Sequence, residues 1–348
     1  MFAALVPLLA CLSLATCIDQ DAHFRPTRSF QFAPAESALN ALIVPPGAQE
    51  VLGQIASSQE LLKPSTAIVT TALHPGHSFQ RWLDHHLNKC SIDKIVVYMD
   101  DPLEQSTFKT WIGNRNVELL AGTQIARDMT PESRIMVRQE AHVTDAINRL
   151  LHQGYEWLLH IDTDELLYEA SGAFSWSRLE NIGLVHFTNH EAVPLDHDTD
   201  DLFNSTLFRT NGRSNKDFLA YGNGKSAVRL SHGVKPAGPH SFEGYHGDVL
   251  EMPANDAVIL HYPSPTFSSW VAKYKHYGDF SGYWFDDRYS PIRLQFMLKS
   301  RDLVQQALRS GDWDEARSFF LRHCFLEPEA RIQALEEGKI QELDPFAK

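Results

Sequence analysis

Three carboxylates, Asp162, Asp164 and Glu165, lie shortly after the apolar run Trp157–Leu159, which predicts a buried strand. Carboxylates this close repel one another, so a cation must offset their charge. Mn²⁺ and Mg²⁺ suit this task because they take carboxylate oxygens and share phosphate oxygens with a ligand. A spacing of two places both aspartates on one face of a strand, and in the turn after it both can reach one ion. The pattern predicts a metal site for a phosphorylated ligand; the alternative is a solvated acidic turn.

The overall composition narrows the class of protein. The chain has 348 residues and a net charge of −13, and 43% of its residues are hydrophobic. This length suits one large α/β domain or two smaller ones, with a full core. The acidic balance argues against nucleic acid, whose phosphates need Lys and Arg, and against a polybasic membrane surface. An acidic enzyme can still bind an anionic nucleotide when a metal ion supplies positive charge.

The N-terminus is apolar and carries no charge before Asp19. This run resembles the hydrophobic core of a signal peptide. It is also about long enough to form a short membrane anchor. Its last residues resemble a bacterial lipobox. We expect residues 1–18 to direct the chain into the secretory pathway, lumenal or anchored in the Golgi, or outside the cytoplasm of a bacterium. Residues 19–63 are polar and contain proline, which predicts a linker or stem. In an oxidising compartment, Cys90 and Cys324 can form one disulfide, and the sequence does not decide whether they do.

The elements that must position the carboxylates alternate along the chain from residue 64 onward. Buried strands are predicted at Ala67–Leu73, Ile95–Met99 and Val117–Leu120, before the strand that ends at Asp162. Helical spacing falls between them, at about residues 79–87, 108–112 and 135–151. Such alternation predicts an α/β fold with a mostly parallel central sheet flanked by helices, and ligands at the carboxyl ends of its strands.

The second half of the chain is less regular. We expect strands at Gly183–Phe187, Lys225–Leu230 and Ala257–Tyr262, a long loop over 194–217, a helix over Phe267–Tyr277 and helical structure from Arg293 to the end. Lys225 and Arg229 share one face of their strand, where they hold phosphate or form a solvated face. Of Lys273 and Lys275, at most one can point into the site from its helix. Trp270 and Tyr274 fit a helical core stripe better than a platform for a sugar.

Several stretches, in this order, resemble the GT-A fold glycosyltransferases, and among them the family 2-like and family 92 (DUF23-type) groups. Besides the acidic stretch, they are Phe79–Leu87 with its Trp82-Leu83-x-x-His86 pattern, Arg138-Gln139, Gly224-Lys225 at a strand start, and His261-Tyr262. The resemblance covers about residues 65–280. The chain departs from it after the first strand, where His74–His77 replaces the Asn-Glu of many relatives, which affects the contacts of the donor's base and ribose.

The resemblance implies a glycosyltransferase domain over residues 64–290 and a helical extension over residues 291–348. It implies transfer of a sugar from a UDP- or GDP-linked donor to a hydroxyl of a glycan, glycoprotein or glycolipid, with Mn²⁺ or Mg²⁺ as cofactor. The implied metal ligands are Asp162, Asp164 and His261. The residues implied at the donor are Thr70, Asp100, Arg138, Asp162 and Lys225. The candidate catalytic residues are Asp164, His240 and Glu243. An inverting transfer needs a general base, and the candidates for it are Glu243, Asp248, His240 and Asp279.

Alternatives remain for these roles and for the function. His261 ends an apolar strand and is otherwise a core histidine; His240 is a ligand, an acceptor contact or a plain loop residue. Glu165 supports the metal ligands or simply holds the turn. A haloacid-dehalogenase-like phosphatase also carries Asp-x-Asp after a strand, but normally after its first strand, whereas here about three strands precede it. An inactive, carbohydrate-binding GT-A-like module is the third hypothesis.

Overall fold

The computed structural model describes residues 63–112, 116–123, 131–170, 172, 174–196, 198–199, 201–210, 218–277 and 295–347. These residues belong to one unit of the chain, Leu61–Lys348. The expected signal or anchor at 1–18 and nearly all of the expected linker lie outside the described residues, as does Asp279. Within the described ranges, no helix combines the length and the apolar character needed to cross a membrane.

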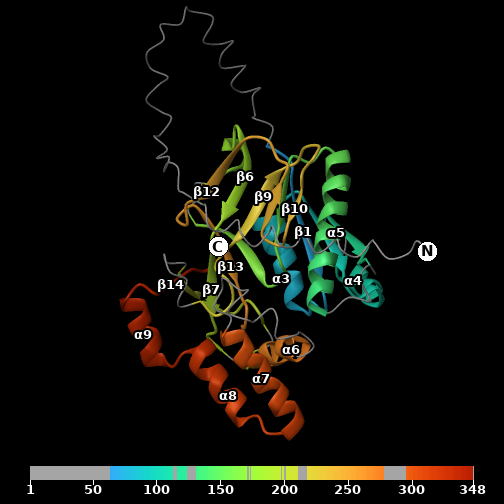
Figure 1. Cartoon of the computed structure of the whole chain (residues 1–348). Coiled ribbons are helices and arrows are strands. Elements are labelled where there is room, and N and C mark those ends of the chain that lie inside the picture. The colour runs from blue at the N-terminus through green and yellow to red at the C-terminus, as the bar shows by residue number, and fades with distance from the viewer. Residues whose placement is uncertain are drawn as a thin grey trace, which may run out of the picture. The chain divides into compact units, whose positions relative to one another are not determined.

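A seven-stranded sheet with the order β12-β6-β9-β4-β1-β2-β3 forms the centre of the fold (Figure 1). Its strands are β1 (Thr66–Ala72), β2 (Lys94–Met99), β3 (Val117–Ala121), β4 (Trp157–His160), β6 (Ile182–Phe187), β9 (Lys225–Arg229) and β12 (Asp248–Met252). Four neighbouring pairs are parallel, and β9 runs antiparallel to both of its neighbours, β4 and β6. The predicted mostly parallel sheet is therefore confirmed.

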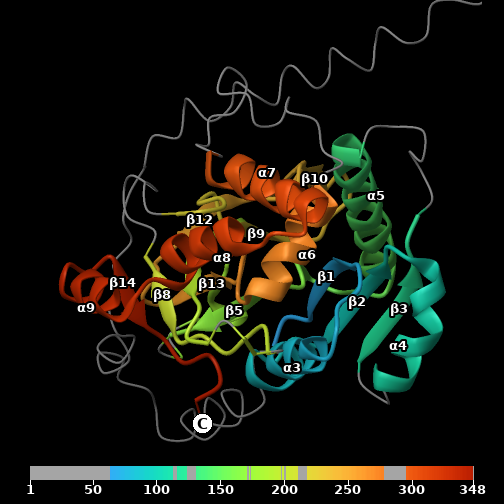
Figure 2. The same ribbon diagram turned by 90° about the horizontal axis from the view of Figure 1, so that it is seen from below.

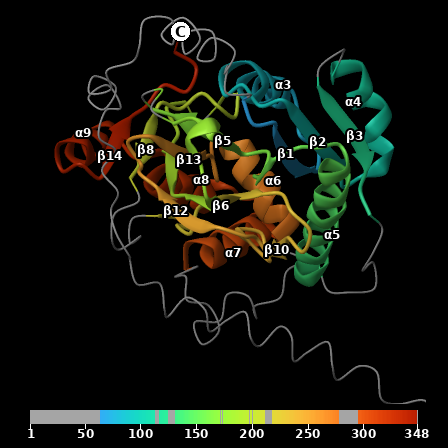
Figure 3. The ribbon, with the colours of Figure 1, turned by 90° about the horizontal axis from the view of Figure 1, so that it is seen from above.

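Helices cover both faces of β1 and β2, which explains why their sequences are continuously apolar. Ile68 packs in one cluster with Trp82 and Leu83 of α3 (Ser78–Asp84), which continues as a π-helical turn, η4 (His85–Lys89). Val69, on the other face, packs in a separate cluster with the apolar stripe of α5 (Pro131–His152). The views from below and above show β1 between α3 and α5 (Figures 2 and 3). Short helices η5 (Pro102–Glu104) and α4 (Gln105–Ile112) connect β2 to β3.

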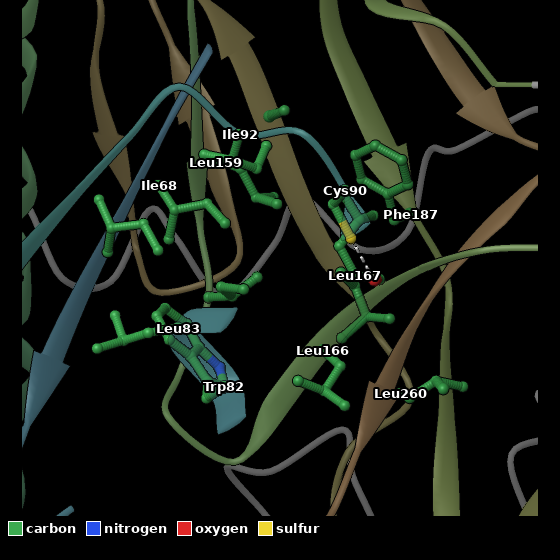
Figure 4. Close-up of a cluster of buried hydrophobic side chains, with 14 of the residues drawn as sticks. Ile68, Trp82, Leu83, Cys90, Ile92, Leu159, Leu166, Leu167, Phe187 and Leu260 are labelled. Carbon is green, nitrogen blue, oxygen red and sulfur yellow. Dashed lines mark hydrogen bonds between the residues drawn. The ribbon is translucent and has the colours of Figure 1, made fainter. Parts of the chain in front are cut away.

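A second sheet has five strands in the order β14-β8-β7-β13-β5. Its strands are β5 (Glu165–Glu169), β7 (Asn189–Val193), β8 (Leu207–Arg209), β13 (Ala257–His261) and β14 (Ile340–Glu342). Leu166, Leu167 and Leu260 of this sheet join Ile68 and Trp82 in one hydrophobic core (Figure 4). The two sheets are thus packed through shared apolar side chains, and β5 follows β4 after a turn.

The remaining elements lie outside the two sheets. They are η6 (Trp176–Arg178), the hairpin of β10 (Lys235–Ala237) and β11 (Ser241–Glu243), α6 (Phe267–Tyr277), α7 (Gln295–Ser310), α8 (Asp314–Phe320), η8 (Leu321–Phe325) and α9 (Pro328–Glu336). Helices α6, α7 and α8 enclose their own cluster around Trp270 and Tyr274, so these two aromatics are core residues (Figure 2). Cys90 and Cys324 are both buried and both free, so the structure holds no disulfide between them.

Two expectations for the second half were wrong. The segment 194–217 was expected to be a loop, yet β8 lies inside it. The chain was expected to be helical from Arg293 to its end, yet β14 forms near Ile340 and pairs with β8 in antiparallel register. Both strands have three residues, too few for a period of two to be visible in the sequence.

Candidate functional site

The acidic residues lie in the turn that carries the chain from the central sheet to the second sheet. Strand β4 ends at His160 and β5 begins at Glu165, so Asp162 and Asp164 occupy the connection. The turn is closed twice: the Glu165 amide donates to the Asp162 carbonyl (3.1 Å), and the Asp162 amide donates to Glu165 Oε2 (2.8 Å). The aspartate side chains stay 27% and 32% exposed, while that of Glu165 is fully buried. Glu165 therefore shapes the turn, and the two aspartates face outward.

Lys225 neutralises part of this charge from within the protein. Because β9 runs antiparallel to β4, its first residue lies beside the end of β4. The fully buried Lys225 Nζ lies 2.5 Å from Asp162 Oδ2 and 3.2 Å from Glu165 Oε2. Burial alone would lower the pKa of Lys225, but the two carboxylates raise it above its ordinary value. The lysine is therefore a permanent counter-ion, and Asp162 is further fixed by Gln139 Nε2 at 3.1 Å.

Asp164 meets a histidine and a second lysine. Its Oδ2 lies 3.7 Å from His261 Nε2, at the end of β13, and 3.6 Å from Lys273 Nζ on α6. Burial would raise the pKa of Asp164, but Lys273 and His261 lower it well below its ordinary value, so it is ionised at neutral pH. Strand pairing explains how residues so distant in sequence meet, since His261 is the register partner of Glu165. Of Lys273 and Lys275, it is Lys273 whose ammonium reaches Asp164.

Tyr221 contacts Glu165, His261 and His240, and no pattern in the sequence indicated this residue. Its hydroxyl donates to Glu165 Oε1 at 2.5 Å. Its ring stacks on His261 (4.5 Å between centroids, 27° between planes) and meets the edge of His240 at 4.8 Å. His240 in turn donates to the Gly224 carbonyl at 2.7 Å, and burial lowers the pKa of this histidine to about 3. His240 is therefore uncharged and lines the site next to Tyr221.

Three residues predicted to bind the donor lie at or near the carboxyl ends of β1 and β2. Asp100 follows β2 and accepts two hydrogen bonds from Arg138 of α5, at 2.7 and 2.6 Å. Thr70, in β1, is buried, and its hydroxyl has no hydrogen-bond partner among the described residues. Asp100 and Arg138 therefore act as one planar, charge-compensated pair at this edge of the sheet.

Other predicted residues lie elsewhere. Glu243 is on β11, where it pairs with Lys235 (2.7 Å), and both side chains are more than half exposed. Asp248 begins β12 and is exposed. Arg229 lies at the other end of β9 from Lys225, where it pairs with Glu156. The structure does not bring Glu243 or Arg229 into contact with the acidic turn, and the role of Glu243 stays a prediction.

The acidic turn fits a divalent ion only in combination with a phosphorylated ligand. Among the residues that the structure describes, no three His, Cys, Asp or Glu side chains form a ready-made metal cage. Mg²⁺ and similar hard ions in nucleotide sites commonly use one or two protein ligands, and phosphates and water supply the rest. Asp164 and His261 offer an oxygen and an imidazole nitrogen 3.7 Å apart, while Asp162 is engaged by Lys225 and Gln139. The donor set therefore fits Mn²⁺ or Mg²⁺ shared with a diphosphate.

Comparison with known proteins adds independent information. No protein-family model matches the chain. The chain is 28% identical over 203 residues to Glycosyltransferase-like At3g57200 of Arabidopsis thaliana, covering 51% of this chain and 38% of that protein. It is 30% identical over 167 residues to Glycosyltransferase-like At2g41451 of the same plant, covering 40% of this chain and 36% of that protein. The chain thus spans little more than a third of the length of these relatives.

The chain is also similar to solved structures, at low sequence identity. Residues 1–349 of TarS from S. aureus cover 78% of this chain and 83% of that chain, at 11% identity and a TM-score of 0.32. Core-mannan synthase A of Aspergillus fumigatus, in its Mn/GDP form, covers 36% of this chain and 42% of that chain, at 6% identity and a TM-score of 0.25. TM-scores of this size carry no argument about function. Both sequence relatives are named as glycosyltransferase-like proteins.

Proposed function

We propose that this chain is a metal-dependent glycosyltransferase that moves a sugar from a UDP- or GDP-linked donor to a hydroxyl of a glycan, glycoprotein or glycolipid. One observation carries the proposal: Asp164, in the turn after a central strand, lies within 4 Å of both His261 and Lys273, which come from distant parts of the sequence. Two cationic or metal-binding groups around one accessible carboxylate suit a diphosphate. The similarity to two glycosyltransferase-like proteins supports the same class.

Each residue of the site would have a distinct role in binding the donor or the ion. Asp164 and His261 would hold the ion, and a bound divalent ion neutralises the charge of the departing diphosphate. Lys273, 24% exposed beside Asp164, would place a further positive charge at that diphosphate. Lys225 holds Asp162 Oδ2 and Gln139 holds Oδ1, so this partly exposed carboxylate would be preorganised for ribose or an ion-bound water. Thr70, Asp100 and Arg138 would line the nucleoside at the edge of β1 and β2.

The acceptor side is proposed more generally. Glu243, Asp248, His240 and Asp279 are the candidates for the group that takes the acceptor's proton. The neutral, partly buried His240 is better placed as an acceptor contact than as a base, because its loss of solvent contact lowers its pKa to about 3. Glu243 is exposed on the β10–β11 hairpin. Residues 1–18 would direct the protein to the secretory pathway, with a role in the Golgi or, in a bacterium, outside the cytoplasm.

A hydrolysis assay with a panel of nucleotide-sugars and Mn²⁺ tests the proposal. We expect slow release of a nucleoside diphosphate from one donor, and its loss in Asp164→Asn. Release of inorganic phosphate would instead indicate the phosphatase hypothesis, and binding of sugar without turnover the inactive module. Glu243→Gln, tested against Lys235→Gln, which breaks the same exposed ion pair, separates a base from a surface residue. Only the base variant should lower turnover, by about a hundredfold or more.

A further inference from the structure

Side chains of α3 and η4 complete the outer edge of β5 in the place of a neighbouring strand. Strand β5 is the last strand of its sheet and pairs with β13 on one side. On the other side, Trp82 Nε1 donates to the Glu165 carbonyl at 2.6 Å. The Leu167 amide donates to His86 Nε2 at 3.1 Å, and His85 Nε2 donates to the Leu167 carbonyl at 2.7 Å. Backbone groups that an edge strand would leave unpaired are thus satisfied by a helix.

The histidine at the centre of this contact has a defined protonation state. His86 Nδ1 donates to the Trp82 carbonyl at 2.9 Å, so Nε2 carries no proton and can accept from Leu167. Burial holds the pKa of His86 well below its ordinary value, which keeps the ring neutral. Cys90 Sγ adds a contact to the Leu167 carbonyl at 3.2 Å (Figure 4). A π-helical turn, closed by the Cys90 amide on the His85 carbonyl, allows neighbouring residues to reach the same strand.

These contacts fix the residue from which the site is built. The Glu165 backbone lies between Trp82 on one side and its register partner His261 on the other. Its side chain then holds the Asp162 amide, Lys225 and Tyr221. A shift of β5 along or away from α3 would therefore move the carboxylate that shapes the turn and the strand pairing that brings His261 to Asp164.

We propose that Trp82 and His86 are positioning residues for the acidic turn, acting through the backbone of β5. This inference rests on the proposed function for its catalytic consequence, but its structural part can be tested alone. The tryptophan and histidine of the Trp82-Leu83-x-x-His86 pattern then serve the site without touching a substrate.

The test compares two substitutions that each remove one buried indole N–H. Trp82→Phe deletes the bond to Glu165, whereas Trp176→Phe is the matched control, since the Trp176 indole N–H has no acceptor among the described residues. Both tryptophans are no more than 5% exposed. The measurements are the hydrogen exchange rate of the Leu167 amide, the Mn²⁺ dissociation constant from calorimetry, and donor hydrolysis. We expect Trp82→Phe alone to speed exchange at Leu167 and weaken Mn²⁺ binding, each about tenfold.

A second pair of variants covers the case in which Trp82→Phe does not fold. His86→Gln keeps an acceptor for the Leu167 amide, whereas His86→Leu removes it, so only the leucine variant should show the faster exchange and weaker Mn²⁺ binding. Equal behaviour of Trp82→Phe and Trp176→Phe, or of the two His86 variants, would overturn the positioning role. Failure of the wild type to bind Mn²⁺ or turn over any donor would overturn the proposed function instead, while exchange at Leu167 still decides the positioning role.

Discussion

The ammonium of Lys225 and the carboxylate of Glu165 lie 3.2 Å apart, and both side chains are fully buried. The same ammonium reaches the partly exposed Asp162 at 2.5 Å, so one buried lysine balances two carboxylates. Ion pairs of this kind recover little more than the cost of removing their charges from water. Removing one partner is a different matter, because the remaining charge stays buried and uncompensated.

Lys225→Met should therefore destabilise the fold by about 3–5 kcal/mol, because it leaves Glu165 and Asp162 without their counter-ion. Lys235→Met is the matched control, since Lys235 pairs with Glu243 at the surface, where both side chains are more than half exposed. That change should leave the free energy of unfolding almost unchanged. Chemical denaturation of the two variants makes the comparison. Equal stability would mean that Lys225 is not the counter-ion of the acidic turn.

Asp164→Asn should weaken Mn²⁺ binding by at least about tenfold, because a neutral amide is a poor ligand for a hard cation. Since Asp164 is 32% exposed in a turn, its loss should change the unfolding temperature little. Asp302→Asn, at an exposed aspartate paired with Arg301, serves as the control. Calorimetric titration with Mn²⁺ measures the effect, and unchanged affinity in Asp164→Asn would remove this residue from the set of ligands.

The contacts of the His186 ring predict that the stability of the protein depends on pH. Its Nδ1 lies 2.6 Å from Glu251 Oε2 and its Nε2 lies 2.8 Å from the Asn223 carbonyl, so both nitrogens face acceptors. Burial would lower the pKa of His186, but these partners raise it above the ordinary value. The stabilisation is therefore complete below about pH 6.5 and is lost as pH rises through the raised folded-state pKa.

The size of this effect should stay below about 1 kcal/mol, because Glu251 is 56% exposed and screened by solvent. Unfolding free energies of the wild type and Glu251→Gln, measured from pH 5.5 to pH 8.5, test the assignment. The glutamine variant should lose most of the slope. An unchanged slope would place its origin in another group.

Gly224→Ala should be strongly destabilising. Gly224 has φ +62°, and a Cβ atom there would lie 2.0 Å from the Phe187 carbonyl oxygen, which a backbone cannot easily vacate. We expect a cost of about 3 kcal/mol together with weaker Mn²⁺ binding, because the next residue is Lys225. Gly233→Ala is the control, since φ is +97° but the nearest atom is 3.7 Å away. Its cost should be the conformational strain alone, about 1–2 kcal/mol. Similar losses for both would rule out a steric role for Gly224.

Much of the central sheet could be predicted because its signals are local. The strands β1, β2 and β4 are continuous apolar runs, and the bounds of α6, Phe267–Tyr277, agree with the predicted helix. The acidic turn was visible because Asp162 and Asp164 lie shortly after such a run. An aspartate near the end of a strand is a strong indication of a functional site when the strand itself is clearly predicted by its apolar sequence.

What escaped prediction depends on pairing between distant segments. Lys225 was considered a phosphate ligand, but only the antiparallel placement of β9 shows that it faces Asp162 and Glu165. Tyr221 precedes β9 without any periodic pattern, so its contact with Glu165 had no signal in the sequence. Strands β8 and β14 stabilise each other across more than a hundred residues. No window of sequence contains both partners.

The insertion of β9 between β4 and β6 also has a consequence for biosynthesis. Until residues 225–229 have left the ribosome, the edge of β4 that they cover is unpaired, although β1 and β2 are already available on its other side. An exposed apolar strand edge is a template for association with other chains. The nascent protein should therefore depend on chaperones during this interval, and its refolding from denaturant should be slow and sensitive to concentration.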